Sequence, residues 1–228
     1  MLFVKAGFIE RGVITNILFL YGLACWRAGR RFARDAFLYG GTALIGIALF
    51  RIGYFDLLAY DPLWSHQSVG ALPLLNGLLL PYGLPLLWLY AARRELQHRD
   101  HARWANGTAV LMLALTFAYV SFCVRQLYQG EFLDGATAGN GETYAYSVAW
   151  LLLGIGLLFL GTLRRDRLVR IASLLVMILT AGKVFLYDAS ELEGLYRVFS
   201  FFGLGISLLG LSWFYARYVF GDGKESRR

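Results

Sequence analysis

The segment 180–197, TAGKVFLYDASELEGLYR, places a lysine, three acids and an arginine between two long apolar runs. The preceding run, 171–187, has one charged side chain, Lys183, and the following run, 195–215, has one, Arg197. A membrane-spanning helix needs roughly 20 mostly apolar residues. The segment is therefore predicted to be a short charged turn between two spanning helices.

The composition of the whole chain agrees with a membrane protein. Of its 228 residues, 58% are hydrophobic and only 16% are charged, whereas soluble domains carry about 25% charged residues. The net charge of +7 comes from basic residues that lie mainly in short loops between apolar runs. Membrane topology explains such a distribution, so we expect no nucleic-acid partner.

The apolar runs predict an all-α fold, a polytopic transmembrane helical bundle of about seven spans. One transmembrane domain, 1–220, is followed by a polar cytoplasmic tail, 221–228. Pro81 and Pro85 fall inside the third predicted span, where we expect a kink. The predicted spans are 2–26, 36–55, 70–92, 104–128, 144–163, 168–187 and 194–220.

Basic and acidic residues alternate between successive loops. The basic residues of three loops and of the C-terminal end account for 16 of the 22 lysines and arginines, and the loops between them are acidic. The positive-inside rule places the basic side in the cytoplasm. With seven spans, the predicted orientation is N-out and C-in.

A basic residue, an aromatic residue three or four positions later and then an acid recur at the predicted outer helix ends. The pattern predicts repeated helical hairpins. Its four instances are Lys5 in FVKAGFIERG, Arg51 with Asp56, Arg125 with Tyr128, and Lys183 with Tyr187 and Asp188. Because the N-terminus starts inside such a unit, we expect upstream helices of a longer protein.

Three segments resemble a known family. They are LPLLNGLLLPYGLP, ETYAYSVAWLLLGIGLLFLG and GKVFLYDASELEGLYRVFSFFGLGISLLGLSWFYARYVF, which together sample most of the chain. They are similar to the DUF2339 family of predicted bacterial membrane proteins, whose members are longer, so this chain resembles their C-terminal part. The resemblance implies a multi-pass protein of the bacterial plasma (inner) membrane and carries over no activity.

The charged outer turns form the candidate site. If Arg51, Arg125 and Lys183 point inward, they form a basic ring that suits an anionic lipid-linked or envelope substrate. The alternative is that each pairs with a nearby acid, because an arginine in lipid costs about 2.5–3.5 kcal/mol and needs a partner. The candidate polar outer-face cluster is Arg51, Asp56, Arg125, Tyr128, Lys183, Tyr187, Asp188, Glu191 and Arg197.

Three functions remain open at this point. A non-enzymatic transport or envelope-scaffold module fits the repeats and the lack of a catalytic motif. A membrane enzyme acting at the outer face on a lipid-linked or anionic envelope substrate fits the charged turns. A proton or ion pathway ranks last, since the predicted spans hold no carboxylate at mid-membrane. We expect no cofactor and no metal, and membrane lipids are the expected partners.

Overall fold

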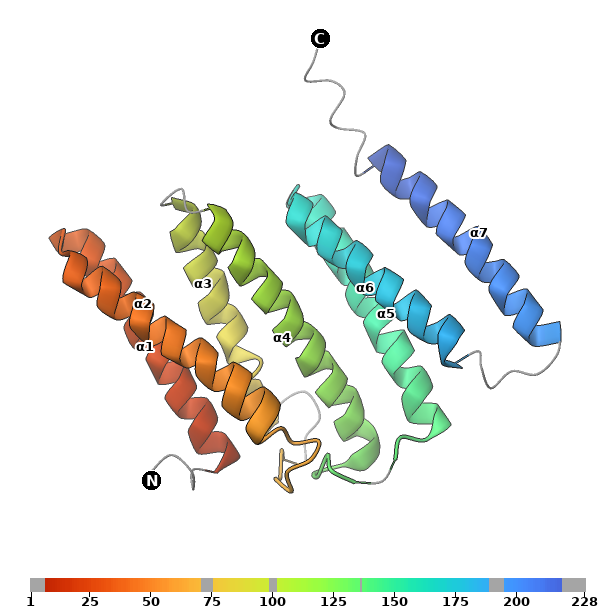
Figure 1. The fold of residues 1–228 in the computed structure, drawn as a ribbon, viewed down its shortest axis with the longest axis horizontal. Helices are drawn as coiled ribbons and strands as arrows, with labels where there is room; N and C mark the ends of the chain where they lie inside the picture. Colours follow the sequence, from red (N-terminus) through yellow and green to blue (C-terminus); the bar gives the residue numbers. More distant parts are fainter. Residues whose placement is uncertain (1–6, 71–75, 99–101, 136, 189–194, 219–228) are drawn as a thin grey trace, which may run out of the picture. The chain divides into compact units, whose positions relative to one another are not determined.

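The computed structural model describes residues 7–70, 76–98, 102–135, 137–188 and 195–218. Helices account for almost all regular structure in these ranges, and no strand occurs among them. The chain forms two compact units, 1–138 and 139–228 (Figure 1). The α-helices are α1 (Phe8–Phe32), α2 (Asp35–Phe50), α3 (Leu84–His98), α4 (Ala102–Gln129), α5 (Asn140–Leu163), α6 (Arg167–Leu186) and α7 (Leu195–Tyr218). Two shorter elements are the π-helix η1 (Arg51–Ala59) and the 3₁₀ turn η2 (Gly77–Leu79).

Five helical segments in the described part are long and apolar enough to cross a membrane. They are Phe8–Phe32, Asp35–Ala59, Arg103–Gln129, Asn140–Leu163 and Arg167–Leu186. The second joins α2 and η1 without a break. The predicted all-α, polytopic membrane fold is confirmed. The apolar part of α7, Phe201–Arg217, is shorter.

The third predicted span differs most from the structure. We expected a kinked helix over 70–92, but α3 begins at Leu84 and has 15 residues, fewer than the roughly 20 that a perpendicular span needs. Pro81 lies in the turn before α3, and Pro85 is its second residue. The first turn of a helix tolerates proline because its N–H groups have no partner within the helix. The prolines therefore start this helix instead of bending it.

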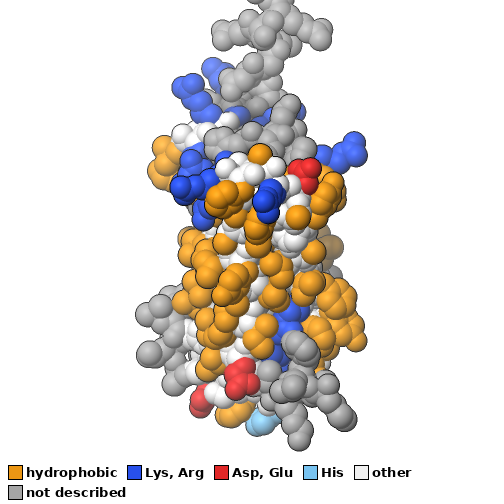
Figure 2. All heavy atoms as spheres, turned by 90° about the vertical axis from the view of Figure 1, so that its left-hand side faces the viewer, with side chains coloured by type: hydrophobic (Ala, Val, Ile, Leu, Met, Phe, Trp, Pro, Cys, Tyr) orange, Lys and Arg blue, Asp and Glu red, His pale blue; other side chains and the backbone are white. Residues whose placement is uncertain are grey.

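In unit 1, α1–α2 and α3–α4 form two helical hairpins. Side chains from all four helices contribute to one apolar core, including Phe19, Ile45, Leu89 and Phe122. The far end of α1 is joined to α3 by an ion pair between the Arg30 Nε and the Glu95 Oε1, at 3.0 Å. The face of unit 1 in Figure 2 shows a hydrophobic band between a mostly basic end and an end with acidic side chains. This distribution matches the predicted alternation of basic and acidic loops.

Unit 2 contains the hairpin α5–α6 together with α7. The connection between α5 and α6 is tight, and Arg165 adopts the left-handed conformation there with φ 51°. The Asp166 side chain caps α6 by accepting a hydrogen bond from the Leu168 N–H at 3.0 Å. An acceptor at this position satisfies one of the unpaired N–H groups of the first turn.

The hairpins α1–α2 and α5–α6 have equivalent packing. In the first, a Cβ added to Gly22 would lie 2.7 Å from the Ile45 Cγ1; in the second, a Cβ added to Gly154 would lie 2.9 Å from the Met177 Cγ. Both glycine positions therefore let the helix pair approach closely. Gly154 lies 132 positions after Gly22 (154 minus 22), and Met177 lies 132 after Ile45 (177 minus 45).

The same spacing relates further positions of the two hairpins, with no insertion or deletion between them. Ala33 has φ 50°, as Arg165 has φ 51°. The expectation of repeated helical hairpins is confirmed for these two. The corresponding pairs are Thr15 and Ser147, Gly22 and Gly154, Gly29 and Gly161, Ala33 and Arg165, Leu38 and Arg170, Ile45 and Met177, Arg51 and Lys183, and Asp56 and Asp188.

Candidate functional site

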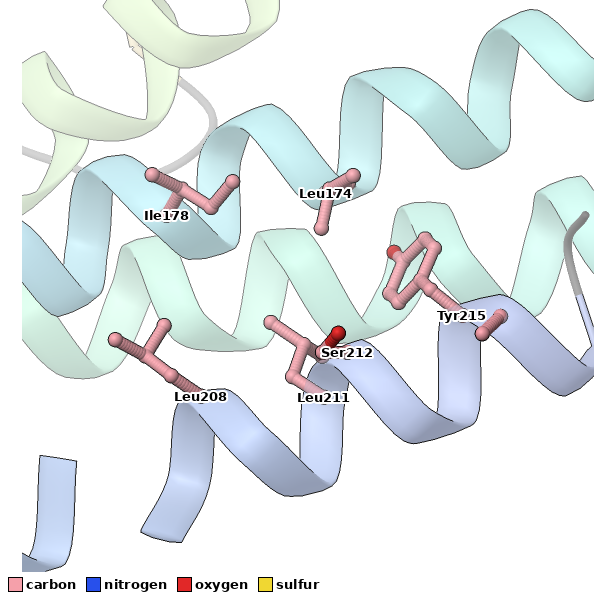
Figure 3. Close-up of a pocket in the computed structure, with 7 residues that line it drawn as sticks. Leu174, Ile178, Leu208, Leu211, Ser212 and Tyr215 are labelled. Atoms are coloured by element: carbon pink, nitrogen blue, oxygen red, sulfur yellow. The ribbon is translucent and has the colours of Figure 1, made fainter. Parts of the chain in front are cut away.

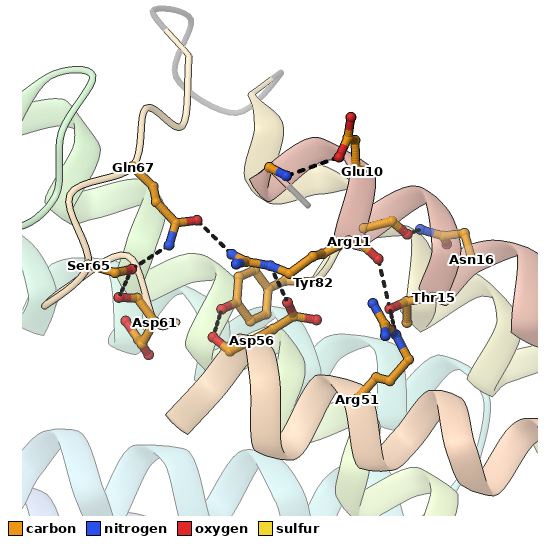
Figure 4. Close-up of polar contacts among 12 residues, drawn as sticks. Glu10, Arg11, Thr15, Asn16, Arg51, Asp56, Asp61, Ser65, Gln67 and Tyr82 are labelled. Carbon is orange, nitrogen blue, oxygen red and sulfur yellow. Dashed lines mark hydrogen bonds and ion pairs between the residues drawn. The ribbon is translucent and has the colours of Figure 1, made fainter. Parts of the chain in front are cut away.

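The first polar cluster lies in unit 1, and we name Arg11, Thr15, Arg51 and Asp56 the Arg51 cluster (Figure 4). The Arg51 Nε donates to the Thr15 Oγ1 at 3.4 Å, and the Arg11 Nε lies 3.7 Å from the Asp56 Oδ1. Asp56 is 1% exposed. A carboxylate so far from water needs a nearby cation, and Arg11 of α1 supplies one. The cluster thus joins α1 to η1.

Side chains from outside these two helices close the Arg51 cluster. The Arg11 guanidinium donates to the Gln67 Oε1 at 2.6 Å and lies 4.7 Å from the centre of the Tyr60 ring. The Tyr82 hydroxyl donates to the Asp56 carbonyl oxygen at 2.6 Å. Arg11 and Asp56 are consequently enclosed by the segment after η1 and by the turn before α3.

The second polar cluster lies in unit 2, and we name Lys183, Ser147, Asp188 and the Thr143 carbonyl the Lys183 cluster. The Lys183 Nζ donates to the Thr143 carbonyl oxygen, the Ser147 Oγ and the Asp188 Oδ1, each at 2.7 Å. The Ser147 Oγ in turn donates to the Asp188 Oδ2 at 2.5 Å. A lysine ammonium has three donors, and all three are directed at α5 or at the end of α6.

The Lys183 cluster contains the residue types of a nucleophilic site. A serine hydroxyl within hydrogen-bond reach of a lysine and a carboxylate could act as an activated nucleophile. However, Ser147 is only 8% exposed, and its hydroxyl accepts a hydrogen bond from Lys183 and donates to Asp188, so the lysine is not placed to accept the serine proton. The geometry therefore favours a fixed link between α5 and α6 over an activated serine.

The two clusters occupy equivalent places in the two hairpins. In both, the basic residue contacts a hydroxyl 36 positions earlier in the chain. In both, the cation also lies over an aromatic ring four positions later, at 5.6 Å for Arg51 over Phe55 and 6.0 Å for Lys183 over Tyr187. The acid follows this ring directly in both. The sequence pattern of base, aromatic residue and acid therefore corresponds to a repeated three-dimensional arrangement.

Arg125 lies near the C-terminal end of α4. Its Nε donates to the Leu133 carbonyl oxygen at 3.1 Å, and its Nη2 lies 3.4 Å from the Gly135 carbonyl oxygen. Asp134, an acid in that same loop, pairs with the His66 Nδ1 at 2.8 Å. Arg125 thus contacts the loop that follows its own helix. Tyr128 is 53% exposed.

The remaining candidate residues are Tyr187 in unit 2 and two residues whose side chains are outside the described part of the chain. Tyr187, which is 62% exposed, forms the aromatic face of the Lys183 cluster. Glu191 and the Arg197 side chain lie outside the described residues. The basic ring of Arg51, Arg125 and Lys183 would draw on both units and stays a prediction.

Sequence reasoning did not select three residues that complete these clusters: Arg11, Thr15 and Ser147. A signal for the two hydroxyls exists in the spacing of small residues. Thr15 is followed by Gly22 and Gly29, and Ser147 by glycines at the same seven-residue intervals. Residues seven apart share one face of a helix, so the hydroxyls lie on the face that packs against the partner helix. For Arg11, no local pattern indicates its partner, which is 45 positions away (56 minus 11).

Asp61 lies in the turn after η1, beyond the spanning segment. Burial raises its pKa above the ordinary value of 3.8, and a hydrogen bond from the Leu63 N–H opposes this shift. That hydrogen bond is 2.8 Å long, and Asp61 is 4% exposed. Desolvation disfavours the charged carboxylate, which is why burial raises the pKa of Asp61.

The helices and the buried charged links between them define a multi-pass α-helical membrane protein. The family model described as "Predicted membrane protein (DUF2339)" matches residues 3–218. The chain belongs to this family. Comparison with curated proteins and comparison with solved structures each give no match.

Proposed function

We propose that this chain is a non-enzymatic structural module, an array of helical hairpins that scaffolds a larger assembly in the envelope. The observation that carries the proposal is the hydrogen bonding of Lys183, whose three donors are directed at groups of its own unit. A lysine used in this way stabilises the packing of two helices and has no donor left for a substrate. Of the two non-enzymatic roles, transport and scaffolding, this arrangement favours scaffolding.

The repetition of the clusters supports the same proposal. A structural role is needed in every hairpin, whereas a catalytic site is needed once. The Arg51 and Lys183 clusters have the same residue spacing, but the further partners of their acids differ. Asp56 forms an ion pair with Arg11, whereas Asp188 accepts a hydrogen bond from Ser147. Variation of the partners around a kept base and acid fits helix stabilisation. The bacterial plasma membrane is the proposed location.

A membrane enzyme acting on a lipid-linked or anionic envelope substrate is the second candidate. The observation that favours it is the hydrogen-bonded chain from Lys183 through Ser147 to Asp188. The two proposals differ in what they require of Ser147. An enzyme needs a reactive hydroxyl, whereas a scaffold needs only a hydrogen bond between helices.

Two measurements on the full chain in native membranes distinguish the candidates. A fluorophosphonate probe, which acylates activated serines, should leave the chain unlabelled, with Ser147→Ala as the matched control. Gentle solubilisation and native electrophoresis should show the chain in an assembly larger than its own 25.6 kDa plus detergent. Labelling that disappears in Ser147→Ala, or migration as an isolated chain, would contradict the scaffold.

A further inference from the structure

One apolar face of α5 is uncovered in the described part of unit 2, and we name it the open face of α5. Tyr144, Val148, Leu151 and Ile155 follow one another at helical intervals along the chain, so they share this face. Their exposed fractions are 44%, 57%, 47% and 48%. The open face is distinct from the face that carries Ser147, which packs against α6.

The third helix of unit 2 packs against α6 and leaves the open face of α5 uncovered. The pocket between α6 and α7 is lined only by residues of these two helices, such as Leu174 and Tyr215 (Figure 3). The Tyr215 hydroxyl lies 2.8 Å from the Ser173 Oγ of α6. These contacts fix α7 on α6, so the partner of the open face has to come from elsewhere.

The equivalent face of α1 is covered by protein. At the spacing of 132 positions, Leu151 corresponds to Phe19 (151 minus 19) and Ile155 corresponds to Leu23 (155 minus 23). Phe19 is 0% exposed and Leu23 is 4% exposed, and both belong to the core that also contains Leu89 of α3. The repeat therefore identifies this face as one that packs against another helix.

Two differences between α1 and α5 exclude a partner like α3. In unit 1, the turn before α3 approaches α1 at Gly12, where an added Cβ would lie 2.8 Å from the nearest side-chain atom of that turn. Trp88 of α3 donates to the Asn16 Oδ1 at 2.8 Å. The residues of α5 at these two places are Tyr144 and Val148. The tyrosine side chain leaves no room for such a turn and the valine accepts no hydrogen bond, so a straight apolar helix fits better.

We propose that the open face of α5 pairs with the same face of a second copy of this chain. Two-fold dimers are by far the commonest symmetric oligomers, and a two-fold pair covers both open faces at once. No charged side chain occurs between Tyr144 and Ile155, so the two copies meet without like-charge repulsion. Side-chain packing between the two membrane helices then holds the pair. The pair does not require the scaffold role, because fluorophosphonate labelling of Ser147 would contradict the scaffold and leave the pair unaffected.

Disulfide cross-linking of the full chain in native membranes tests the pair. Leu151→Cys places a thiol in the middle of the open face. The matched control is Leu152→Cys, at a 64% exposed position about 100° around the helix. After oxidation with copper phenanthroline, Leu151→Cys should migrate on a non-reducing denaturing gel at twice the 25.6 kDa of the chain, whereas Leu152→Cys and wild type should migrate as single chains. Equal cross-linking of the two variants, or no cross-linking of Leu151→Cys, would overturn the pair.

A second pair of variants tests the same face without cross-linking. Wild type, released from the membrane in mild detergent, should be dimeric in native mass spectrometry. Leu151→Trp enlarges a side chain in the middle of the open face and should shift the protein to monomer, whereas Leu152→Trp should stay dimeric. Because Leu151 is exposed within unit 2, the larger side chain leaves the packing of α5 on α6 intact. A monomeric wild type, which would mean that lipid covers the face, or a dimer that Leu151→Trp does not affect, would overturn the proposal.

Discussion

Replacing Lys183 by methionine should destabilise unit 2 strongly. The change removes the only cation that donates to Asp188 among the described contacts and leaves that carboxylate, 7% exposed, with the Ser147 hydroxyl as its donor. Removing one partner of a buried ion pair costs about 3–5 kcal/mol. The Lys183 side chain is 17% exposed, which gives water some access, so we expect a loss of about 3 kcal/mol in the free energy of unfolding.

A double-mutant cycle separates this charge effect from lost packing. Lys183→Met combined with Asp188→Asn removes both charges, so the double variant should cost about 2 kcal/mol less than the sum of the single variants. The assay is denaturant unfolding of the full chain in micelles, followed by tryptophan fluorescence. Arg31→Met is the control, since Arg31 is exposed and such surface changes stay within about 0.5 kcal/mol.

The reasoning would be refuted by additive single costs or by a Lys183→Met variant that loses less than about 1 kcal/mol. Either result would mean that the ion pair observed between Lys183 and Asp188 contributes little to stability. The cluster would then need another role, and the nucleophilic interpretation of Ser147 would gain weight.

Three further predictions concern the repeat and the turn after η1. Gly22→Ala should lower the free energy of unfolding by about 1–3 kcal/mol, because the added Cβ would overlap the facing helix. Gly46→Ala, where a Cβ meets nothing within 4 Å, should be neutral or stabilising. Unfolding curves that are the same for the two variants would contradict this. Ser147→Thr should be tolerated, because Thr15 occupies the equivalent position, whereas Ser147→Ala should lower the free energy of unfolding by about 1–2 kcal/mol. If both variants behave alike in thermal-shift measurements, Thr15 and Ser147 are not equivalent. Asp61 should contribute stability that is fully present below its ordinary pKa of 3.8 and is lost as the pH rises through its raised folded pKa. Asp61→Asn keeps the acceptor for Leu63 and should remove this contribution, so an unchanged slope of stability against pH would exclude the effect.

The helices were predictable from sequence because long apolar runs admit few alternatives in a membrane. The helix over 70–92 was placed wrongly because Pro85 was taken as a residue inside a helix, although proline is equally suited to the first turn. Apolarity alone cannot distinguish these two positions. The pairing of Lys183 with Asp188 was among the expected alternatives, since the two residues are only five positions apart.

The partners from the preceding helix could not be assigned in the same way. Arg11 reaches Asp56 only because the α1–α2 hairpin brings the start of α1 close to η1, and a single sequence does not specify which faces meet. The glycines seven and fourteen positions after Ser147 place it on the packing face of its helix, but they do not indicate that its hydroxyl contacts a charged group. The constant spacing of 132 positions between the hairpins is visible in the sequence, but it becomes meaningful once equivalent contacts are known.

The most direct test of the structural role is the coupling free energy between each basic residue and the hydroxyl it contacts. One cycle combines Lys183→Met with Ser147→Ala, and the other combines Arg51→Met with Thr15→Val. If both clusters stabilise their hairpins, both cycles should give coupling of the same sign, between about 0.5 and 3 kcal/mol. Coupling below about 0.5 kcal/mol in both hairpins would contradict the structural role of the clusters.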